Sequence, residues 1–332
     1  MNKVKILTLC LAFALTAFGC LSNENIQDKT SKINEESVVA STKPIEKKDN
    51  KDDLKKENKN LSEKDNDKSD SEIEKKEVNN PTENNSSSPE KKNETSINKI
   101  DTNLDNTKIS WWYKPNKTHT TPEVNKDIKF DLSKYDALYV GNTDEKVIYL
   151  TFDEGYENGY TSKILDTLKA NDVKAIFFVT SPYVKGNPEL IKRMVDEGHI
   201  VGNHSNTHPS MPTVTGDETK FNNEFKDVED KFKDITGQDM PKFFRPPMGE
   251  YSEKSLAMTK NLGYKTIFWS FAYHDWDVNK QPDPSTAKQT MLNSVHNGCV
   301  MLVHAVSKTN TEILDEVIKE IKAQGYEFKL LP

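Results

Sequence analysis

The sequence predicts an α/β fold, a distorted (β/α) barrel of about seven units that follows a disordered tether. Three observations support this prediction. Apolar segments of strand length alternate with amphipathic segments of helix length from residue 147 onward. Five of six strand-like segments run into an ionisable side chain, as expected where parallel strands deliver functional groups to one rim. Residues 21–109, in contrast, contain no Phe, Trp, Tyr, Gly or Cys.

The segment 21–109 is dominated by Lys, Glu, Asp, Asn and Ser. It cannot bury enough apolar surface to offset its conformational entropy, so we expect a disordered charged linker. The folded part is then residues 110–332, which is long enough for one domain with a sizeable core. The formal net charge of −7 argues against a nucleic-acid partner, because no basic face is available to displace counterions from phosphates.

The N-terminus has the pattern of an export signal. Two lysines precede an apolar run over residues 6–18, which is shorter than a comfortable membrane span. The run closes with Gly19 and Cys20, which resemble a bacterial lipoprotein box. We therefore expect residues 1–20 to be a lipoprotein-type signal peptide, with lipidated Cys20 holding the protein on the outer face of the cytoplasmic membrane. Ordinary secretion or an uncleaved anchor would also place the domain in the cell envelope, outside the cytoplasm.

Amphipathic spacing predicts the helices in chain order. Helix 161–170 follows strand 147–152, and helix 188–198 opens with Pro and closes with Gly, the residues favoured at those ends. Helix 217–235 repeats large apolar residues at helical spacing, so this stripe should face the core. Further helices are expected at 252–261, 284–295 and 311–323.

Short apolar runs between these helices predict the remaining strands. These runs cover residues 175–179, 200–203, 242–244, 266–271 and 299–303. Strands that alternate with helices imply a parallel sheet. Residues 110–146 lack a regular pattern, and we expect their aromatic cluster around Trp111 to pack as a flap on the barrel rather than to line a sugar groove.

The carboxyl ends of the predicted strands carry groups suited to catalysis. Because these ends meet on one rim of a barrel, side chains far apart in the sequence should come together there. In chain order the candidates are Asp153, Glu154, His204, His208, Arg245, Asp275 and His304. The set contains a base, metal ligands, an acid and a carboxylate to orient the acid.

His204 and His208 form a candidate metal site. Their spacing of four would put both imidazoles on one face of a helical turn. Together with a neighbouring carboxylate they would bind a divalent metal that keeps an open position for water. Asp153 and Glu154 point to opposite sides of an extended strand. One could bind the metal while the other takes a proton only if the chain turns there, which Gly155 would allow.

His304 is the candidate general acid. A lone His after an apolar run is more often a core residue, but Asp275 could act as its charge partner and keep its pKa high. Arg245 could form a structural ion pair, or could hold Asp153 ionised as a base.

Five motifs together resemble those of a known family. They are Thr-Phe-Asp-Glu-Gly around Asp153, His-Ser-Asn-Thr-His from His204 to His208, Arg-Pro-Pro at Arg245, Asp-Trp at Asp275 and Leu-Val-His at His304. In this order they are similar to the motifs of the polysaccharide deacetylases of carbohydrate esterase family four, over residues 147–331. The stretch 149–161 and the Phe-Trp-Ser-Phe-Ala segment at 268–272 look most like the branch that makes muramic δ-lactam in spore cortex peptidoglycan.

The resemblance implies a metal-dependent de-N-acetylase with a role for each motif residue. Asp153 would be the general base with Arg245 as its tuning partner, and His304 would be the general acid, oriented by Asp275. A divalent metal, with zinc favoured, would be held by His204, His208 and Glu154, although most relatives have Asp in place of Glu154. Substrate contacts would come from Leu302 at the acetyl methyl, from the Met248 N–H at the oxyanion and from Trp276.

The resemblance also implies a substrate and a setting. The substrate would be N-acetylmuramic acid in peptidoglycan glycan strands, in sporulating cells and after a peptidoglycan amidase has removed the peptide. Two alternatives stay open: deacetylation of N-acetylglucosamine in peptidoglycan or another polysaccharide, and a catalytically weak glycan-binding lipoprotein of the envelope. The intact base, His pair and acid favour an enzyme, since a binding protein needs none of them.

Overall fold

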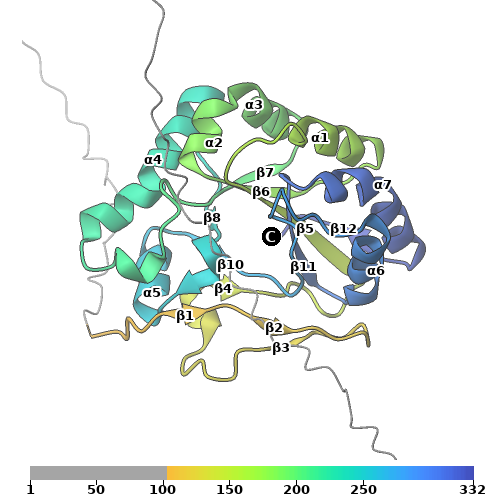
Figure 1. The fold of residues 1–332 in the computed structure, drawn as a ribbon. Coiled ribbons are helices and arrows are strands. Elements are labelled where there is room, and N and C mark those ends of the chain that lie inside the picture. The colour runs from red at the N-terminus through yellow and green to blue at the C-terminus, as the bar shows by residue number, and fades with distance from the viewer. Residues whose placement is uncertain (1–102) are drawn as a thin grey trace, which may run out of the picture. The chain divides into compact units, whose positions relative to one another are not determined.

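The structure, a computed structural model, describes residues 103–332, and its centre is a parallel β-sheet that curls into a barrel (Figure 1). The strands pair in the order β11 (Cys299–His304), β5 (Val147–Glu154), β6 (Ile176–Val179), β7 (Ile200–Asn203), β8 (Phe243–Phe244), β10 (Lys265–Ile267) and β4 (Ala137–Leu138), and β12 (Glu327–Phe328) also pairs with β5. An isolated bridge from Val140 to Cys299 links the two ends of this order. The predicted distorted (β/α) barrel is confirmed.

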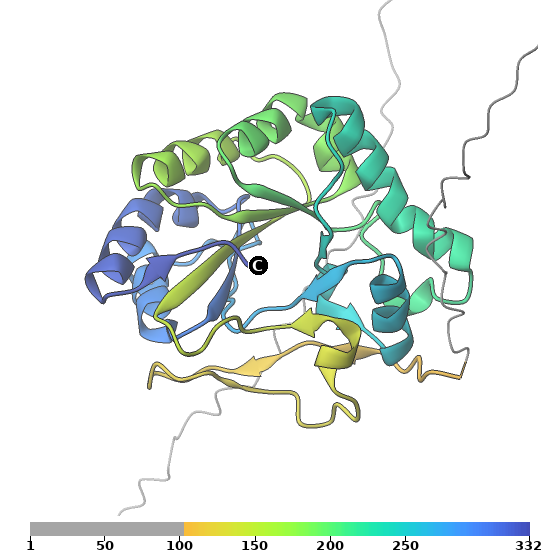
Figure 2. The same ribbon diagram turned by 180° about the vertical axis from the view of Figure 1, so that it is seen from behind.

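Helices surround the outer side of the sheet (Figures 1 and 2). They are α1 (Thr161–Ala170), α2 (Ser181–Gly186), α3 (Pro188–Asp196), α4 (Glu218–Thr236), α5 (Glu253–Asn261), α6 (Pro284–Ser294) and α7 (Lys308–Ala323). The six helices predicted from amphipathic spacing are all present. The sequence did not predict α2, which is too short to show a helical period of apolar residues. It also did not predict the two-residue strands β4 and β12.

One predicted strand is shorter than expected. The run 266–271 is strand only as far as Ile267. Beyond it the chain crosses to β11, where the N–H groups of Ser270 and Phe271 both donate to the Val300 carbonyl over 3.0 and 3.2 Å. The apolar residues of this run therefore help to close the barrel instead of extending β10.

Strand β5 divides the core into two layers. All eight of its residues are buried. Ile148, Leu150 and Phe152 belong to the cluster between sheet and helices, whereas Val147 and Tyr149 belong to the cluster inside the barrel. This alternation follows from the two-residue period of a strand, and it decides on which side each later residue of β5 lies.

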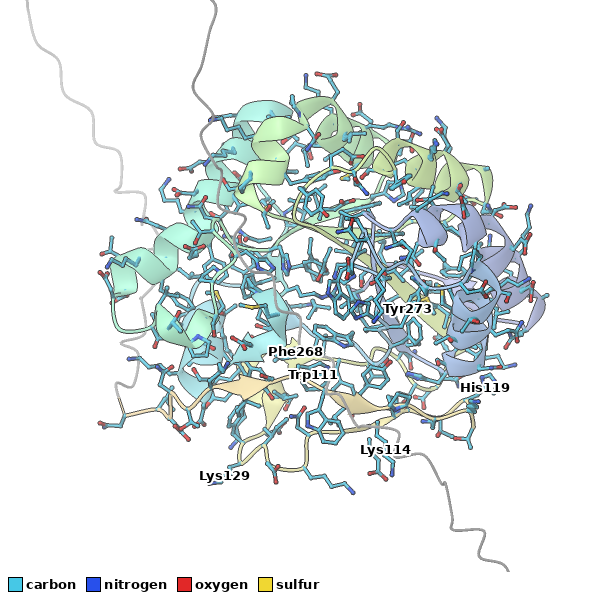
Figure 3. The ribbon with its side chains drawn as sticks, in the orientation of Figure 1. Trp111, Lys114, His119, Lys129, Phe268 and Tyr273 are labelled. Atoms are coloured by element: carbon cyan, nitrogen blue, oxygen red, sulfur yellow. The ribbon has the colours of Figure 1, made fainter. Side chains whose placement is uncertain are left out.

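The segment before the barrel packs on it as a flap, as predicted. The Trp111 ring stacks on Phe268 with centroids 4.5 Å apart, and its Nε1 donates to the Trp269 carbonyl over 2.9 Å (Figure 3). The Trp111 N–H donates to the Gly249 carbonyl. Gly249 has a φ of 64°, and a Cβ at this position would lie 2.7 Å from the Trp269 ring. The flap therefore fits closely against the barrel.

Contacts to the barrel begin before residue 110. The Lys254 N–H donates to the Asp105 carbonyl over 3.0 Å, and Asn106 accepts from the Ser252 hydroxyl over 2.7 Å. The last residues of the predicted linker thus belong with the domain. The predicted signal peptide 1–20 and the linker up to residue 102 lie outside the described residues. Within the described part, no helix is long and apolar enough to cross a membrane.

These contacts predict where the chain can be shortened. Removing residues 21–100 should leave activity on soluble glycan unchanged, because every contact of Asp105 and Asn106 is kept. A deletion that extends through residue 107 should lower the melting temperature. Thermal unfolding and turnover of the two truncated proteins test this, and a large loss of activity in the shorter deletion would contradict it.

Candidate active site

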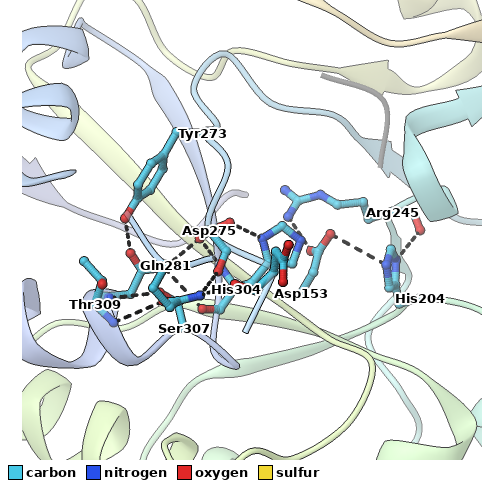
Figure 4. Close-up of polar contacts among 11 residues, drawn as sticks. Asp153, His204, Arg245, Tyr273, Asp275, Gln281, His304, Ser307 and Thr309 are labelled. Carbon is cyan, nitrogen blue, oxygen red and sulfur yellow. Dashed lines mark hydrogen bonds and ion pairs between the residues drawn. The ribbon is translucent and has the colours of Figure 1, made fainter. Parts of the chain in front are cut away.

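The carboxyl ends of the strands surround a cavity of about 530 Å³. Seven residues singled out from the sequence line it, namely Asp153, His204, His208, Met248, Trp276, Leu302 and His304. Arg245 and Asp275 are completely buried and contact two of these lining residues (Figure 4). Glu154 does not line the cavity. The barrel thus brings together nine of the ten predicted site residues.

Asp153 is a buried carboxylate held by Arg245. Arg245 Nη1 donates to Asp153 Oδ1 over 2.7 Å. The arginine is itself fixed, because its Nε donates to the Ile267 carbonyl and its guanidinium lies 4.3 Å from the centre of the Phe178 ring. Burial would raise the pKa of Asp153, but several effects oppose it, of which the charge of Arg245 is the largest, and together they lower the pKa. Asp153 is therefore an ionised group that can accept a proton.

Glu154 lies on the other side of the sheet from the cavity. It follows Asp153 on a strand that runs straight to its end, so its side chain points to the helix side of the sheet. There it is fully buried, and the Thr161 hydroxyl donates to its Oε1 over 3.3 Å. Burial first, and then the charge of Glu157, raises the pKa of Glu154 well above its usual range. Glu154 therefore faces away from the cavity that the two histidines line.

His204 and His208 lie together at the cavity. Their ring centroids are 4.9 Å apart and the ring planes meet at 72°. His204 Nδ1 donates to the Arg245 carbonyl over 2.8 Å, which leaves Nε2 facing Asp153 Oδ2 at 3.6 Å. Burial is the main cause that lowers the pKa of His204 and brings that of His208 to about 3. Both imidazoles are therefore neutral and can act as ligands.

The loop that carries the two histidines is not a helical turn. Ser205 and His208 have φ values of 71° and 58°, in the left-handed region that residues other than Gly seldom adopt. Glu224 of α4 holds the loop, because its two carboxylate oxygens accept from the Thr207 N–H and the Thr207 hydroxyl over 2.8 and 2.7 Å. The spacing of four thus correctly predicted that the two histidines lie together, but the predicted helical turn between them is wrong.

A metal ion fits this site only in part. In the described residues, no group of three or more His, Cys, Asp and Glu side chains is arranged to hold a metal. Two neutral imidazoles at the cavity suit a divalent cation, and the nearest carboxylate is Asp153, whose Oδ1 is already bonded to Arg245. The two histidines therefore suit a cation, but the described residues do not complete a set of three ligands around them.

His304 and Asp275 form the second half of the site. His304 Nδ1 donates to Asp275 Oδ1 over 2.7 Å, and the His304 backbone N–H donates to Oδ2 over 2.8 Å. Burial would lower the pKa of His304, but the charge and hydrogen bond of Asp275, together with the charge of Asp153, outweigh burial and raise the pKa. His304 therefore holds a proton at a higher pH than an ordinary histidine.

The predicted base and the predicted acid lie side by side. In the parallel pairing of β5 with β11, Asp153 is the direct partner of His304. Both side chains face the inside of the barrel, and adjacent strands are about 4.8 Å apart. Leu302 lies two residues earlier on the same face of β11, and the Trp276 ring is 5.7 Å from His304. An apolar wall thus lies beside Asp153 and His304.

Glu224 and Asn310 are two polar residues of this region that the sequence did not predict as part of the site. Glu224 falls within the apolar stripe of α4, next to Phe225, and is 8% exposed. An acidic residue inside such a stripe is itself a signal, because a buried carboxylate needs a partner. Asn310 is 2% exposed near the start of α7, and it donates to Asp275 Oδ2 over 2.6 Å. No pattern in the sequence marks Asn310.

This site on this fold defines a class of enzyme. A (β/α) barrel that places an ionised carboxylate beside a histidine with a raised pKa, next to two neutral histidines, is suited to acid–base hydrolysis of an amide. The family described as polysaccharide deacetylase matches residues 140–267. The chain belongs to this family, because it is 48% identical to a characterised deacetylase over 84% of that protein's length.

Two relatives, one of them also compared as a solved structure, show what the chain is similar to. The peptidoglycan-N-acetylmuramic acid deacetylase PdaA of Bacillus subtilis strain 168 is 48% identical over 224 residues, which are 68% of this chain and 84% of that protein. A peptidoglycan-N-acetylglucosamine deacetylase of Bacillus cereus is 32% identical over 205 residues, 60% of this chain and 72% of that protein. The solved structure of Bacillus subtilis PdaA, a family 4 carbohydrate esterase, superposes with a TM-score of 0.66 at 46% identity, over 68% of this chain and 96% of that one.

Proposed function

We propose that the protein is a peptidoglycan de-N-acetylase that acts on N-acetylmuramic acid. The observation that carries the proposal is the register of β5 with β11, which pairs Asp153 with His304 at one cavity. The similarity to a peptidoglycan-N-acetylmuramic acid deacetylase at 48% identity supports this sugar as the target. The freed amine would then be available for δ-lactam formation with the lactyl carboxyl group in spore cortex.

The proposed reaction uses one base and one acid. Asp153 accepts a proton from water as the water oxygen bonds to the acetyl carbonyl carbon, and Arg245 keeps this carboxylate ionised and in place. His304 then donates its Nε2 proton to the sugar nitrogen, so that the carbon–nitrogen bond breaks and acetate leaves. Asp275 binds the other ring nitrogen and stabilises the protonated imidazole.

The cavity wall supplies contacts for the acetyl group. Leu302 is 4% exposed and lies beside His304, where it suits the acetyl methyl. Met248 lines the same cavity with a φ of 58°, and we assign its N–H to the oxyanion. Trp276 offers an aromatic face to the sugar ring.

A divalent cation, with zinc favoured, would be held by His204 and His208. When bound, such an ion supplies Lewis-acid polarisation of the carbonyl or of water. Removing the ion by chelation should reduce the rate by orders of magnitude.

Three single variants test the metal assignment by metal content as well as by rate. His204→Ala and His208→Ala should each lose bound metal, whereas Glu154→Gln should keep it, because Glu154 faces the helices and is held in its neutral form. Isothermal titration with zinc measures this. Loss of metal in Glu154→Gln, with the histidine variants unaffected, would return Glu154 to the metal site.

The setting of the enzyme follows the sequence predictions. We propose an exported protein, anchored through lipidated Cys20 or released into the envelope, that acts on peptidoglycan strands after an amidase has removed the peptide. The second candidate substrate is N-acetylglucosamine, which the similarity to a peptidoglycan-N-acetylglucosamine deacetylase supports.

Mass spectrometry of muropeptides after treatment with the purified protein distinguishes these substrates. Strands with and without stem peptides should be compared. Loss of acetyl from muramic acid in the peptide-free strands alone supports the proposal. Loss from glucosamine alone moves the second candidate ahead, and binding without acetate release favours a glycan-binding protein.

A further inference from the structure

Asp275, the carboxylate partner of His304, is also held by a residue that does not line the cavity. Asp275 is completely buried, and three N–H groups donate to its two oxygens. Two of them come from His304, and the third is the Asn310 side-chain amide at 2.6 Å. Asn310 Nδ2 also lies 3.2 Å from the His304 carbonyl. Asn310 therefore contacts both members of the acid pair.

A second residue fixes which way the Asn310 amide points. The Tyr273 hydroxyl donates to Asn310 Oδ1, so the amide must present its NH2 group to Asp275 (Figure 4 shows Tyr273 and Asp275). Burial, and then the charge of Asp275, raises the pKa of Tyr273, so this hydroxyl keeps its proton. The order of donors thus runs in one direction, from Tyr273 through Asn310 to Asp275.

The backbone of this region is also tied down. Gln281 Nε2 donates to the Asp275 carbonyl over 2.9 Å, and its Oε1 accepts from the Ser307 hydroxyl over 2.6 Å. Ser307 caps α7 by accepting from the Asn310 N–H over 3.1 Å. The loop that carries Asp275 is therefore fastened to the first turn of α7, the turn that also carries Asn310.

We infer that Tyr273 and Asn310 are positioning residues that hold the Asp275 carboxylate in the orientation His304 needs to act as the acid. Without Asn310, the only N–H groups bonded to this carboxylate would be those of His304, the residue that it has to orient. A neutral amide is suited to this task, because it supplies a donor without the positive charge that would weaken the attraction between Asp275 and His304. The inference rests on the proposed function in that His304 is taken to be the acid.

The test uses two variants of this pair and one control. Asn310→Leu keeps the size of the side chain but removes the donor, and Tyr273→Phe removes only the hydroxyl. Asn171→Leu is the control, because Asn171 likewise donates to an aspartate of α7, Asp315, over 2.8 Å but lies outside the site. The full exported chain is used throughout, with circular dichroism to establish that each variant is folded.

Two readouts separate positioning from mere stability. Asn310→Leu should lower kcat by about 10- to 100-fold with little change in KM, and Tyr273→Phe should lower it less. The downfield proton resonance of the His304 Nδ1–H bonded to Asp275 should broaden or shift in both variants and stay unchanged in Asn171→Leu. A folded Asn310→Leu protein with normal kcat and an unchanged resonance would overturn the inference.

The resonance needs no substrate, so the two proposals can fail separately. If the wild-type protein releases no acetate from muramic acid but the resonance moves in Asn310→Leu, then the positioning role stands and the proposed substrate is wrong. If Asn310→Leu does not fold, Tyr273→Phe decides alone, and an unchanged resonance in it counts against the inference.

Discussion

Replacing Asp153 by Asn is expected to reduce kcat by on the order of 10²- to 10⁴-fold and to leave KM for the glycan nearly unchanged. The amide keeps the shape of the carboxylate and can still accept one hydrogen bond from Arg245, but it cannot take a proton from water. Arg245 then stays buried without its counter-charge, so the variant should also be less stable than the wild type.

Stability and catalysis must therefore be measured together for Asp153→Asn. Asp166→Asn is a matched control, because Asp166 also pairs with an arginine, Arg193, over 2.6 Å, but on the exposed surface. This control should change neither the rate nor the melting temperature appreciably. A folded Asp153→Asn protein with near-normal turnover would remove Asp153 as the base and would favour a glycan-binding role.

The second large effect is expected from the acid. His304→Ala should lower kcat by a comparable factor, on the order of 10²- to 10⁴-fold, because protonation of the leaving amine is needed only in the transition state. Asp275→Asn should act through His304, so its effect should be much smaller when His304 is already Ala. Equal losses from Asp275→Asn in both backgrounds would show that Asp275 has a separate role.

The direction in which the rate changes with pH can be predicted for the wild type and for Asp275→Asn. The base must be ionised and the pKa of Asp153 is lowered, so the wild-type rate should hold to low pH. The acid must be protonated and the pKa of His304 is raised, so the rate should fall only above the pH at which an ordinary histidine titrates. Asp275→Asn removes the charge that raises this pKa, so the fall should begin at lower pH. Rate profiles of kcat/KM against pH measure this shift.

The sequence could predict the barrel and most of the site because both follow from local patterns. Amphipathic helices alternate with apolar strands, and an ionisable residue at the end of a strand must lie on the rim of a barrel. Asp153, His204 and His304 were found in this way. The catalytic roles could be predicted only from these residues as a set, since each residue alone is more simply explained as part of the core or of the surface.

The features that the sequence could not predict depend on contacts between distant segments. Glu154 was assigned to the metal because a turn at Gly155 was possible, whereas pairing of β5 with β6 continues through Glu154 and keeps the strand extended. Asn310 gains its position only when α7 packs beside the loop of Asp275, which lies 35 residues away in the chain. Neither the extended strand at Glu154 nor the position of Asn310 can be predicted from composition or residue spacing.

Hydrolysis in heavy-oxygen water tests the central claim most directly. Wild-type protein and Asp153→Asn should be incubated with glycan strands that carry peptide-free N-acetylmuramic acid, and the released acetate and the strands should be analysed by mass spectrometry. We expect wild-type protein to release acetate with one heavy oxygen, to leave one free amine on muramic acid for each acetate, and to do so far faster than Asp153→Asn. Strands that remain fully acetylated with the wild-type protein, or equal release by the variant, would contradict the account.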